Sequence, residues 1–267
     1  DPINNFLDTF QNMSSYTWRG SVFYMGEYIS AMNLPWHYPI VWISITTPIL
    51  YLLLFVIGSA LIFLRLLNRF FELSPENKIN DLWKGKKELI DLIMLLIFYL
   101  TIFLVIKINS TLYGGWRHLY FIYPCLIFIS ISGLEFILRK LNLKYLLIIV
   151  VPFLIYNAIW MVKNHPFQFV YFNMLAGKDI NNNFELDYWG VSGRNIARKI
   201  NNNNQLLYYK DKCIYVTPIH LIEPFISTEY HCVKHLDSIY PRSTEKYILV
   251  KYTRAMRRVH PSDCKLI

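Results

Sequence analysis

The sequence predicts an α-helical polytopic membrane protein with about four transmembrane helices and a small C-terminal α/β domain outside the cytoplasm. The first reason is composition, since 54% of the 267 residues are hydrophobic and only 17% are charged, whereas an average soluble protein carries about 25% charged residues. The second reason is distribution, because the apolar residues are gathered into a few long runs. This pattern excludes a disordered chain and argues against an ordinary soluble enzyme.

Residues 1–38 are predicted to form an external leader ahead of the membrane region. The leader has more aromatic residues than a solvated linker needs, namely Tyr16, Trp18, Phe23, Tyr24, Tyr28, Trp36 and Tyr38. We therefore expect it to pack on the membrane surface or on protein outside this chain. Because the chain begins at Asp1 and not at Met, it is expected to be processed or to be part of a longer protein.

Residues 39–163 contain four runs that are long enough to cross a bilayer, which requires about 20 mainly apolar residues. The predicted helices cover about residues 40–66, 89–108, 118–138 and 145–162. Pro48, Pro124 and Pro152 lie inside these runs. Proline is tolerated in membrane helices, where neighbouring groups satisfy the freed carbonyls, so the prolines do not argue against four spans.

Basic residues predict the orientation of these spans. They gather in the loop after the first span and in the loop after the third, at Arg65, Arg69, Lys78, Lys84, Lys86, Lys87, Arg139, Lys140 and Lys144. The positive-inside rule places both loops in the cytoplasm. The leader, the loop between the second and third spans and the C-terminal tail are then extracytoplasmic, in an integral inner-membrane protein. Topology thus explains the net charge of +9, and no nucleic-acid partner is expected.

Residues 164–267 form a polar tail long enough for a small domain. Hydrophobic periodicity and turn signals predict helices near 192–200 and 220–225 and strands near 212–216 and 246–252. The His and Cys residues of the tail lack a metal-ligand spacing, so neither a metal nor another cofactor is expected in this chain. On the oxidising side of a membrane, Cys213 is expected to pair with Cys232 or with Cys264, and the choice stays open.

The loop between the second and third spans ends in two candidate phosphate ligands, Arg117 and His118. Arginine donates a fork of N–H groups to phosphate oxygens, and histidine supplies a second donor. Gly114 and Gly115 allow the backbone to approach a ligand closely. At the level of the lipid head groups this pair fits a lipid phosphate. The alternative is an interfacial anchor whose side chains merely reach the head groups, and the spacing by itself does not exclude it.

A second candidate lies in the tail, where Glu185 and Asp187 stand beside Tyr188 and Trp189. Aromatic rings next to carboxylates are common where sugars bind. They are equally common in a domain that docks on a membrane surface, so both interpretations remain open.

Four sequence blocks together resemble a known family. They are LPWHYPIVWISITTPI (34–49), LYGGWRHLYFIYP (112–124), HPFQFVYFN (165–173) and FELDYWG followed by Val191 and Ser192 (184–192). In combination they resemble the C-terminal half of bacterial membrane glycosyltransferases that are similar to the dolichyl-phosphate-mannose–protein mannosyltransferases, which have the GT-C fold. The resemblance covers nearly the whole chain.

The resemblance implies transfer of a sugar from a polyprenyl-phosphate carrier to an acceptor on the outer face of the membrane. It implies that Arg117 and His118 meet the carrier phosphate. It also implies that His165, Glu185, Asp187, Tyr188 and Trp189 line the outer mouth of the active site or fix the tail to it. A divalent metal assists some members of the family, so the complete enzyme is a candidate for one.

The chain departs from the family pattern in one respect. The family's catalytic acid lies in the first external loop among early spans, and no residue of this chain corresponds to it. The resemblance therefore implies a missing N-terminal transmembrane half that carries the acid. The alternative is a non-catalytic membrane scaffold or a decayed fragment that at most binds lipid phosphate.

Overall fold

The computed structural model describes residues 4–5, 8, 18–71, 83–202, 213–217, 223–226, 232–235 and 248–251. The chain divides into two compact units. The first comprises Asp1–Val22 and Tyr28–Lys178, and the second comprises Phe23–Glu27 and Asp179–Ile267. The first unit therefore includes the segment that follows the last long helix, up to Lys178.

The described leader contains a short hairpin and a short helix. Strands β1 (Ser21–Tyr24) and β2 (Glu27–Ser30) form a two-stranded sheet. Met25 and Gly26 join them with φ angles of 50° and 86°, the left-handed conformations of a tight hairpin turn. Helix α2 (Tyr38–Thr46) follows, with a proline in its first turn, where the missing N–H costs nothing.

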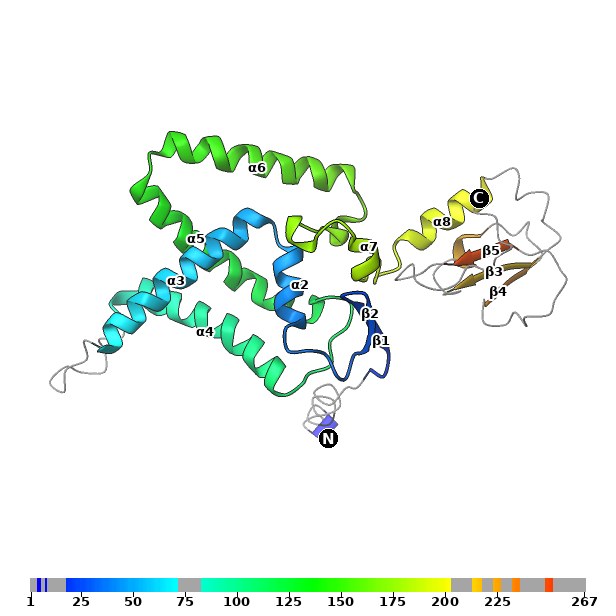
Figure 1. Ribbon diagram of the computed structural model, residues 1–267, viewed down its shortest axis with the longest axis horizontal. Helices are drawn as coiled ribbons and strands as arrows, with labels where there is room; N and C mark the ends of the chain where they lie inside the picture. Colours follow the sequence, from blue (N-terminus) through cyan, green and yellow to red (C-terminus); the bar gives the residue numbers. More distant parts are fainter. Residues whose placement is uncertain are drawn as a thin grey trace. The chain divides into compact units, whose positions relative to one another are not determined.

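Among its described residues, the first unit contains four helices that are long and apolar enough to cross a membrane, as predicted (Figure 1). Their bounds are α3 (Ile49–Phe71), α4 (Gly85–Lys107), α5 (Tyr123–Lys140) and α6 (Leu143–Lys163). The 3-10 helix η2 (Arg117–Ile122) runs directly into α5, so that the third candidate span covers Arg117–Lys140. Two further 3-10 turns follow α6, at η3 (Gln168–Val170) and η4 (Met174–Ala176).

The first apolar run does not form one helix from residue 40. The structure divides it into α2 and α3 at Thr47 and Pro48, where Thr47 is extended with ψ 136°. Proline disfavours the helical conformation of the residue before it and has no N–H to donate, so the chain breaks here. The candidate span consequently begins at Ile49, and α2 is a separate element whose Tyr38 and Trp42 are fully buried.

Helices α3 and α5 cross at a pair of glycines, Gly58 and Gly133. A Cβ atom added to Gly58 would lie 2.0 Å from the carbonyl oxygen of Ile129, and one added to Gly133 would lie 2.2 Å from that of Leu54. Only glycine, which has no Cβ atom, lets the backbones of the two helices lie this close together. Small residues at a membrane-helix interface let the backbones approach and gain van der Waals contact, so this pair fixes where the two helices meet.

Helix α4 packs against α3 through aromatic rings. The ring centroids of Phe55 and Phe98 lie 4.7 Å apart. The hydroxyl of Tyr99 donates a hydrogen bond of 3.0 Å to the Oγ of Ser59. Polar bonds between apolar helices contribute roughly 0.6 kcal/mol each in membranes, so most of this packing energy comes from the rings.

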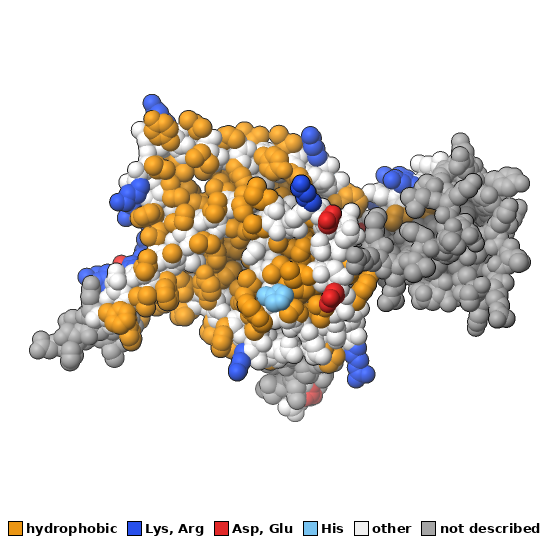
Figure 2. Space-filling view, in the orientation of Figure 1, with side chains coloured by type: hydrophobic (Ala, Val, Ile, Leu, Met, Phe, Trp, Pro, Cys, Tyr) orange, Lys and Arg blue, Asp and Glu red, His pale blue; other side chains and the backbone are white. Residues whose placement is uncertain are grey.

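Helix α6 makes few contacts with the rest of the described chain. Its only buried residue there is Leu146. Apolar side chains cover the visible surface of the long helices, while Lys and Arg lie along its margins (Figure 2). A bilayer would cover such a surface, which agrees with a multi-pass membrane protein.

The second unit contains a short helix, α7 (Ile180–Asn183), and an amphipathic helix, α8 (Ser192–Asn201). The 3-10 turn η5 (Glu223–Phe225) and three strands follow: β3 (Cys213–Thr217), β4 (Cys232–His235) and β5 (Ile248–Lys251). The strands form a parallel sheet in the order β4-β3-β5.

The helix predicted near residues 192–200 and the strands predicted near 212–216 and 246–252 are present as α8, β3 and β5, whereas β4 was not predicted. The helix predicted at 220–225 lies partly outside the described residues. In the register of β3 and β4, Cys213 and Cys232 are Cα partners. Cys264 lies outside the described residues, so the disulfide stays a prediction.

Candidate functional site

The loop between α4 and η2 is held in place before it reaches the candidate ligands. The amide of Asn109 donates a hydrogen bond of 3.1 Å to the carbonyl oxygen of Met32. Gly114 and Gly115 adopt φ angles of 63° and 68°, which other residues rarely adopt. A Cβ atom on Gly115 would lie 3.3 Å from the Trp42 ring. The two glycines therefore turn the chain tightly against α2.

The turn brings four side chains together, and we call Trp18, Tyr113, Arg117 and His118 the Tyr113 cluster. The Arg117 guanidinium carbon lies 4.4 Å from the centroid of the Tyr113 ring. The His118 ring meets the same ring edge-on at 4.6 Å, and the Trp18 ring lies 4.5 Å from it. The Nε–H group of Arg117 also donates a hydrogen bond of 3.4 Å to Nε2 of His118. Tyr113 thus holds both predicted phosphate ligands on one ring.

Trp116 anchors the start of η2 beside this cluster. It is 5% exposed, and its indole N–H donates a hydrogen bond of 2.8 Å to Oγ1 of Thr46 at the end of α2. Leu119 and Ile122 on η2 are also buried. The buried residues fix the backbone, while His118 is exposed and Arg117 is half-buried. The guanidinium keeps further N–H groups that can donate to an anionic oxygen, whereas Nε2 of His118 accepts from Arg117 in the structure and becomes a donor only if it is protonated and leaves that contact.

Asn173, the last residue of the block 165–173, ties the segment after α6 to the break between α2 and α3. Its side-chain amide donates bonds of 2.6 Å to the carbonyl oxygens of Ser44 and Thr47. Its backbone N–H donates to the carbonyl oxygen of Ile45 at 2.8 Å. A broken helix leaves carbonyls without partners, and Asn173 satisfies three of them. The asparagine at the end of this block is therefore required by the fold at the break between α2 and α3.

His165 does not belong to the contacts described for the Tyr113 cluster. It is exposed in the turn after α6, and its Nδ1 lies 2.8 Å from the amide nitrogen of Gln168. The same amide donates to the carbonyl oxygen of Met161 at 3.2 Å. These contacts close the end of α6, and the predicted role of His165 at an active-site mouth stays a prediction.

Asp187 has a structural task in the second unit. Its two carboxylate oxygens accept hydrogen bonds from the backbone N–H groups of Val191 (3.0 Å) and Ser192 (2.8 Å). A carboxylate at this place satisfies free N–H groups and complements the positive end of the helix dipole. Asp187 therefore holds the start of α8.

The other predicted residues of the tail differ in exposure. Glu185 is 1% exposed and Tyr188 is 8% exposed, whereas Trp189 is 53% exposed. The backbone N–H of Glu185 donates to the carbonyl oxygen of Phe23 at 3.1 Å. Trp189 is thus the one of the four that presents a ring to its surroundings, and a role for the set in acceptor binding stays a prediction.

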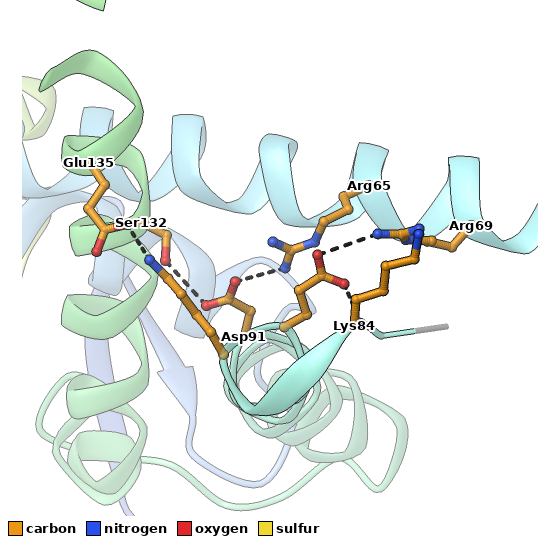
Figure 3. Close-up of polar contacts among 8 residues, drawn as sticks. Arg65, Arg69, Lys84, Asp91, Ser132 and Glu135 are labelled. Carbon is orange, nitrogen blue, oxygen red and sulfur yellow. Dashed lines mark hydrogen bonds and ion pairs between the residues drawn. The ribbon is translucent and has the colours of Figure 1, made fainter. Parts of the chain in front are cut away.

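A separate polar network joins α3, α4 and α5 (Figure 3). Asp91 on α4 is 2% exposed and forms an ion pair of 2.7 Å with Arg65 on α3. Its other oxygen accepts a longer bond of 3.4 Å from Ser132 on α5. A buried charge in a membrane protein needs such a partner, and here one carboxylate links three helices.

Two more ion pairs surround this carboxylate (Figure 3). Arg69 lies 3.5 Å from Glu88, which also accepts a bond of 2.6 Å from the backbone N–H of Lys84. Lys87 pairs with Glu135 on α5. Sequence reasoning predicted none of these three ion pairs, because it used the loop charges only to assign the orientation of the spans.

The described residues contain no group of three or more His, Cys, Asp or Glu side chains placed to hold a metal ion. Comparison of the chain with protein-family models, curated proteins and solved structures gives no match. The geometry of the chain itself therefore carries the functional argument.

The structure brings Arg117 and His118 together, and it adds two residues that sequence reasoning did not select, Trp18 and Tyr113. Tyr113 precedes Arg117 by four residues across the Gly-Gly turn. That spacing was a usable signal, whereas the position of Trp18 depends on the fold of the leader.

Proposed function

We propose that this chain is the C-terminal portion of an integral-membrane glycosyltransferase that transfers a sugar from a polyprenyl-phosphate carrier to an acceptor on the outer face of the membrane. The observation that carries the proposal is the Tyr113 cluster, in which Arg117 and His118 lie together at the first turn of a candidate span. The four sequence blocks that resemble membrane glycosyltransferases support it.

The chemistry of the leaving group explains the need for these residues. When the bond between the sugar and the carrier phosphate breaks, negative charge develops on the phosphate oxygen that leaves. Arg117 neutralises that charge, and a protonated His118, released from its contact with Arg117, donates a second hydrogen bond. Donors fixed in advance stabilise such charge best, because they need no rearrangement during the reaction. Their fixed position on the Tyr113 ring suits this role.

The acceptor hydroxyl must lose a proton as it attacks the sugar, and this step needs a base. We assign that base to no residue of this chain. Asp187 is held by the backbone of α8, and Glu185 is buried. The proposal therefore gives this chain the leaving-group side of the site and gives the acidic residue to the N-terminal half implied by the resemblance.

The proposal includes an orientation. The end of the bundle with Arg65, Arg139 and Lys144 faces the cytoplasm, and the Tyr113 cluster lies at the outer side with the leader and the tail. The distribution of Lys and Arg in the loops supports this orientation. The tail is proposed to be a small α/β domain in the extracytoplasmic space.

Substitution of Arg117 in the intact protein tests the proposal. Arg117→Ala should lower sugar transfer from labelled polyprenyl-phosphate sugars about 100- to 1,000-fold, as loss of one fixed donor to a developing oxyanion does. Arg117→Lys should retain part of the activity, because lysine keeps the charge and loses the planar fork. The matched control is Lys107→Ala, which removes an exposed cation at the end of α4, just before the loop that leads to Arg117. Unchanged transfer by Arg117→Ala would overturn the proposal.

A second candidate is a membrane scaffold that binds lipid phosphate without turnover. The observation in its favour is the structural use of Asp187, which was predicted to line the mouth of an active site and instead binds the backbone at the start of α8. The two functions differ in one readout. A scaffold binds polyprenyl phosphate through Arg117 and forms no transfer product with any labelled polyprenyl-phosphate sugar.

A further inference from the structure

The turn between α5 and α6 concentrates positive charge at one end of the bundle. Helix α5 ends at Lys140 and α6 begins at Leu143. The turn between them is well defined, since Asn142 accepts a bond of 3.0 Å from the backbone N–H of Lys144. Arg139, Lys140 and Lys144 are all exposed. Three cations therefore stand within six residues on a fixed turn.

No acid in the described part of the chain forms an ion pair with these three cations. The described acids of α4 and α5 form their ion pairs with other cations: Asp91 with Arg65, Glu88 with Arg69, and Glu135 with Lys87. Of the three cations, Arg139 also acts electrostatically on Glu135 without forming an ion pair with it. Within the described residues, the acids of α4 and α5 are therefore engaged mainly by other cations, and the turn keeps an excess of positive charge.

The apolar surroundings of the turn indicate what balances the charge. Leu141 and Leu143 flank it with 50% and 56% of their surfaces exposed, and Ile148 one turn further along α6 is 68% exposed. Cations next to exposed aliphatic side chains fit a ligand with an anionic head and an apolar tail. A nucleic acid or an acidic soluble protein would meet only the charged half of this surface.

We propose that the α5–α6 turn binds the phosphate of an anionic phospholipid through Arg139, Lys140 and Lys144, with the acyl chains along the exposed side of α6. Clusters of Lys and Arg next to a membrane helix attract anionic lipids. The nearly unburied α6 leaves room for the lipid beside the turn. This site is separate from the Tyr113 cluster and does not depend on sugar transfer.

The test uses the full chain purified in an uncharged detergent. Phosphatidylglycerol and phosphatidylcholine are titrated separately, and the midpoint of thermal unfolding (Tm) is followed at each lipid concentration. Ligands that bind only the folded state raise the Tm as they saturate it. The wild-type protein should be stabilised at a lower concentration of phosphatidylglycerol than of phosphatidylcholine.

The variant Arg139→Gln/Lys140→Gln/Lys144→Gln should need about 100-fold more phosphatidylglycerol for the same effect, since each cation at a membrane surface contributes about a factor of five. The matched control, Lys107→Gln/Lys163→Gln/Lys178→Gln, removes the same charge from exposed sites elsewhere in the first unit and should behave like wild type. If the triple variant does not fold, Lys140→Gln/Lys144→Gln takes its place with an expected change of about 25-fold.

Two results would overturn the inference. The first is an equal response of the turn variant and the wild type to phosphatidylglycerol. The second is equal stabilisation by inorganic polyphosphate, which would make the turn a general anion-binding surface and remove the role of the acyl chains. Added salt should weaken the wild-type response, because exposed charges are screened.

Discussion

Replacement of Arg65 by leucine is the sharpest stability test of the helical bundle. In the structure the Nη2 atom of Arg65 lies 2.7 Å from the Oδ2 atom of Asp91, whose side chain is 2% exposed. The remaining described partner of this carboxylate is Ser132, at 3.4 Å. Arg65→Leu therefore leaves a buried carboxylate with one long hydrogen bond.

The size of the effect follows from burial. Removing one partner of a buried ion pair costs about 3–5 kcal/mol, because the other charge stays desolvated. The Arg65 side chain is 31% exposed, so water already weakens the pair and we take the lower end, about 3 kcal/mol. For a chain of this size that corresponds to a fall in Tm of roughly 6–12 °C.

The assay is thermal unfolding in one detergent, followed by tryptophan fluorescence, for a matched set of variants. Lys87→Leu breaks the ion pair with Glu135. The Lys87 side chain is 59% exposed and that of Glu135 is 42% exposed, so the loss of this pair should cost at most about 1 kcal/mol. The double variant Arg65→Leu/Asp91→Leu should be more stable than Arg65→Leu alone, since it leaves no buried charge.

Two results would refute this reasoning. One is an Arg65→Leu variant that loses no more stability than Lys87→Leu. The other is a double variant that is less stable than Arg65→Leu, because the carboxylate would then have been satisfied without its arginine.

Three more predictions follow from packing, hydrogen bonds and titration. Gly133→Ala should lower the Tm in detergent by several degrees, because its Cβ atom would lie 2.2 Å from the carbonyl oxygen of Leu54 and overpacking costs about 1–3 kcal/mol; an unchanged Tm would contradict the α3–α5 crossing. Asn173→Ala should cost roughly 2–4 kcal/mol in thermal unfolding, because the carbonyl oxygens of Ser44 and Thr47 lose their side-chain donor and each buried unsatisfied group costs about 1–3 kcal/mol; a loss below about 0.5 kcal/mol would argue against this tie. Burial raises the pKa of Tyr24 to about 12, so the unfolded chain releases this proton first, and stability should fall as the pH rises from about 10 towards 12. Denaturant unfolding of Tyr24→Phe over this range should show a weaker decline than wild type, and identical declines would contradict the prediction.

The four long apolar helices were predictable because each depends on a local property, an apolar run of sufficient length. The break at Thr47 was signalled by Pro48, but proline also occurs inside α6 at Pro152 without ending that helix. What distinguishes the two sites is Asn173, which supplies donors at the first break from 126 or more residues away. Such a long-range partner leaves no periodic signal in the sequence.

The candidate site shows the same division between local and distant contacts. Arg117, His118 and Tyr113 lie within six residues, so their proximity follows from a short turn with two glycines. The task of Asp187 was also local, since its partners Val191 and Ser192 follow within five residues, yet side-chain type alone did not separate a helix cap from a residue that lines the mouth of an active site. The pairing of Arg65 with Asp91 depends on how two helices face each other, which composition does not specify.

The central claim is that Arg117 and His118 recognise a lipid phosphate, and a binding measurement tests it most directly. The full chain in detergent is titrated with polyprenyl phosphate and, separately, with the unphosphorylated polyprenol of the same length. We predict that the phosphate form binds at least tenfold more tightly, and that Arg117→Ala removes this preference while Lys107→Ala keeps it. Equal binding of the two lipids by wild type, or an unchanged preference in Arg117→Ala, would contradict the claim.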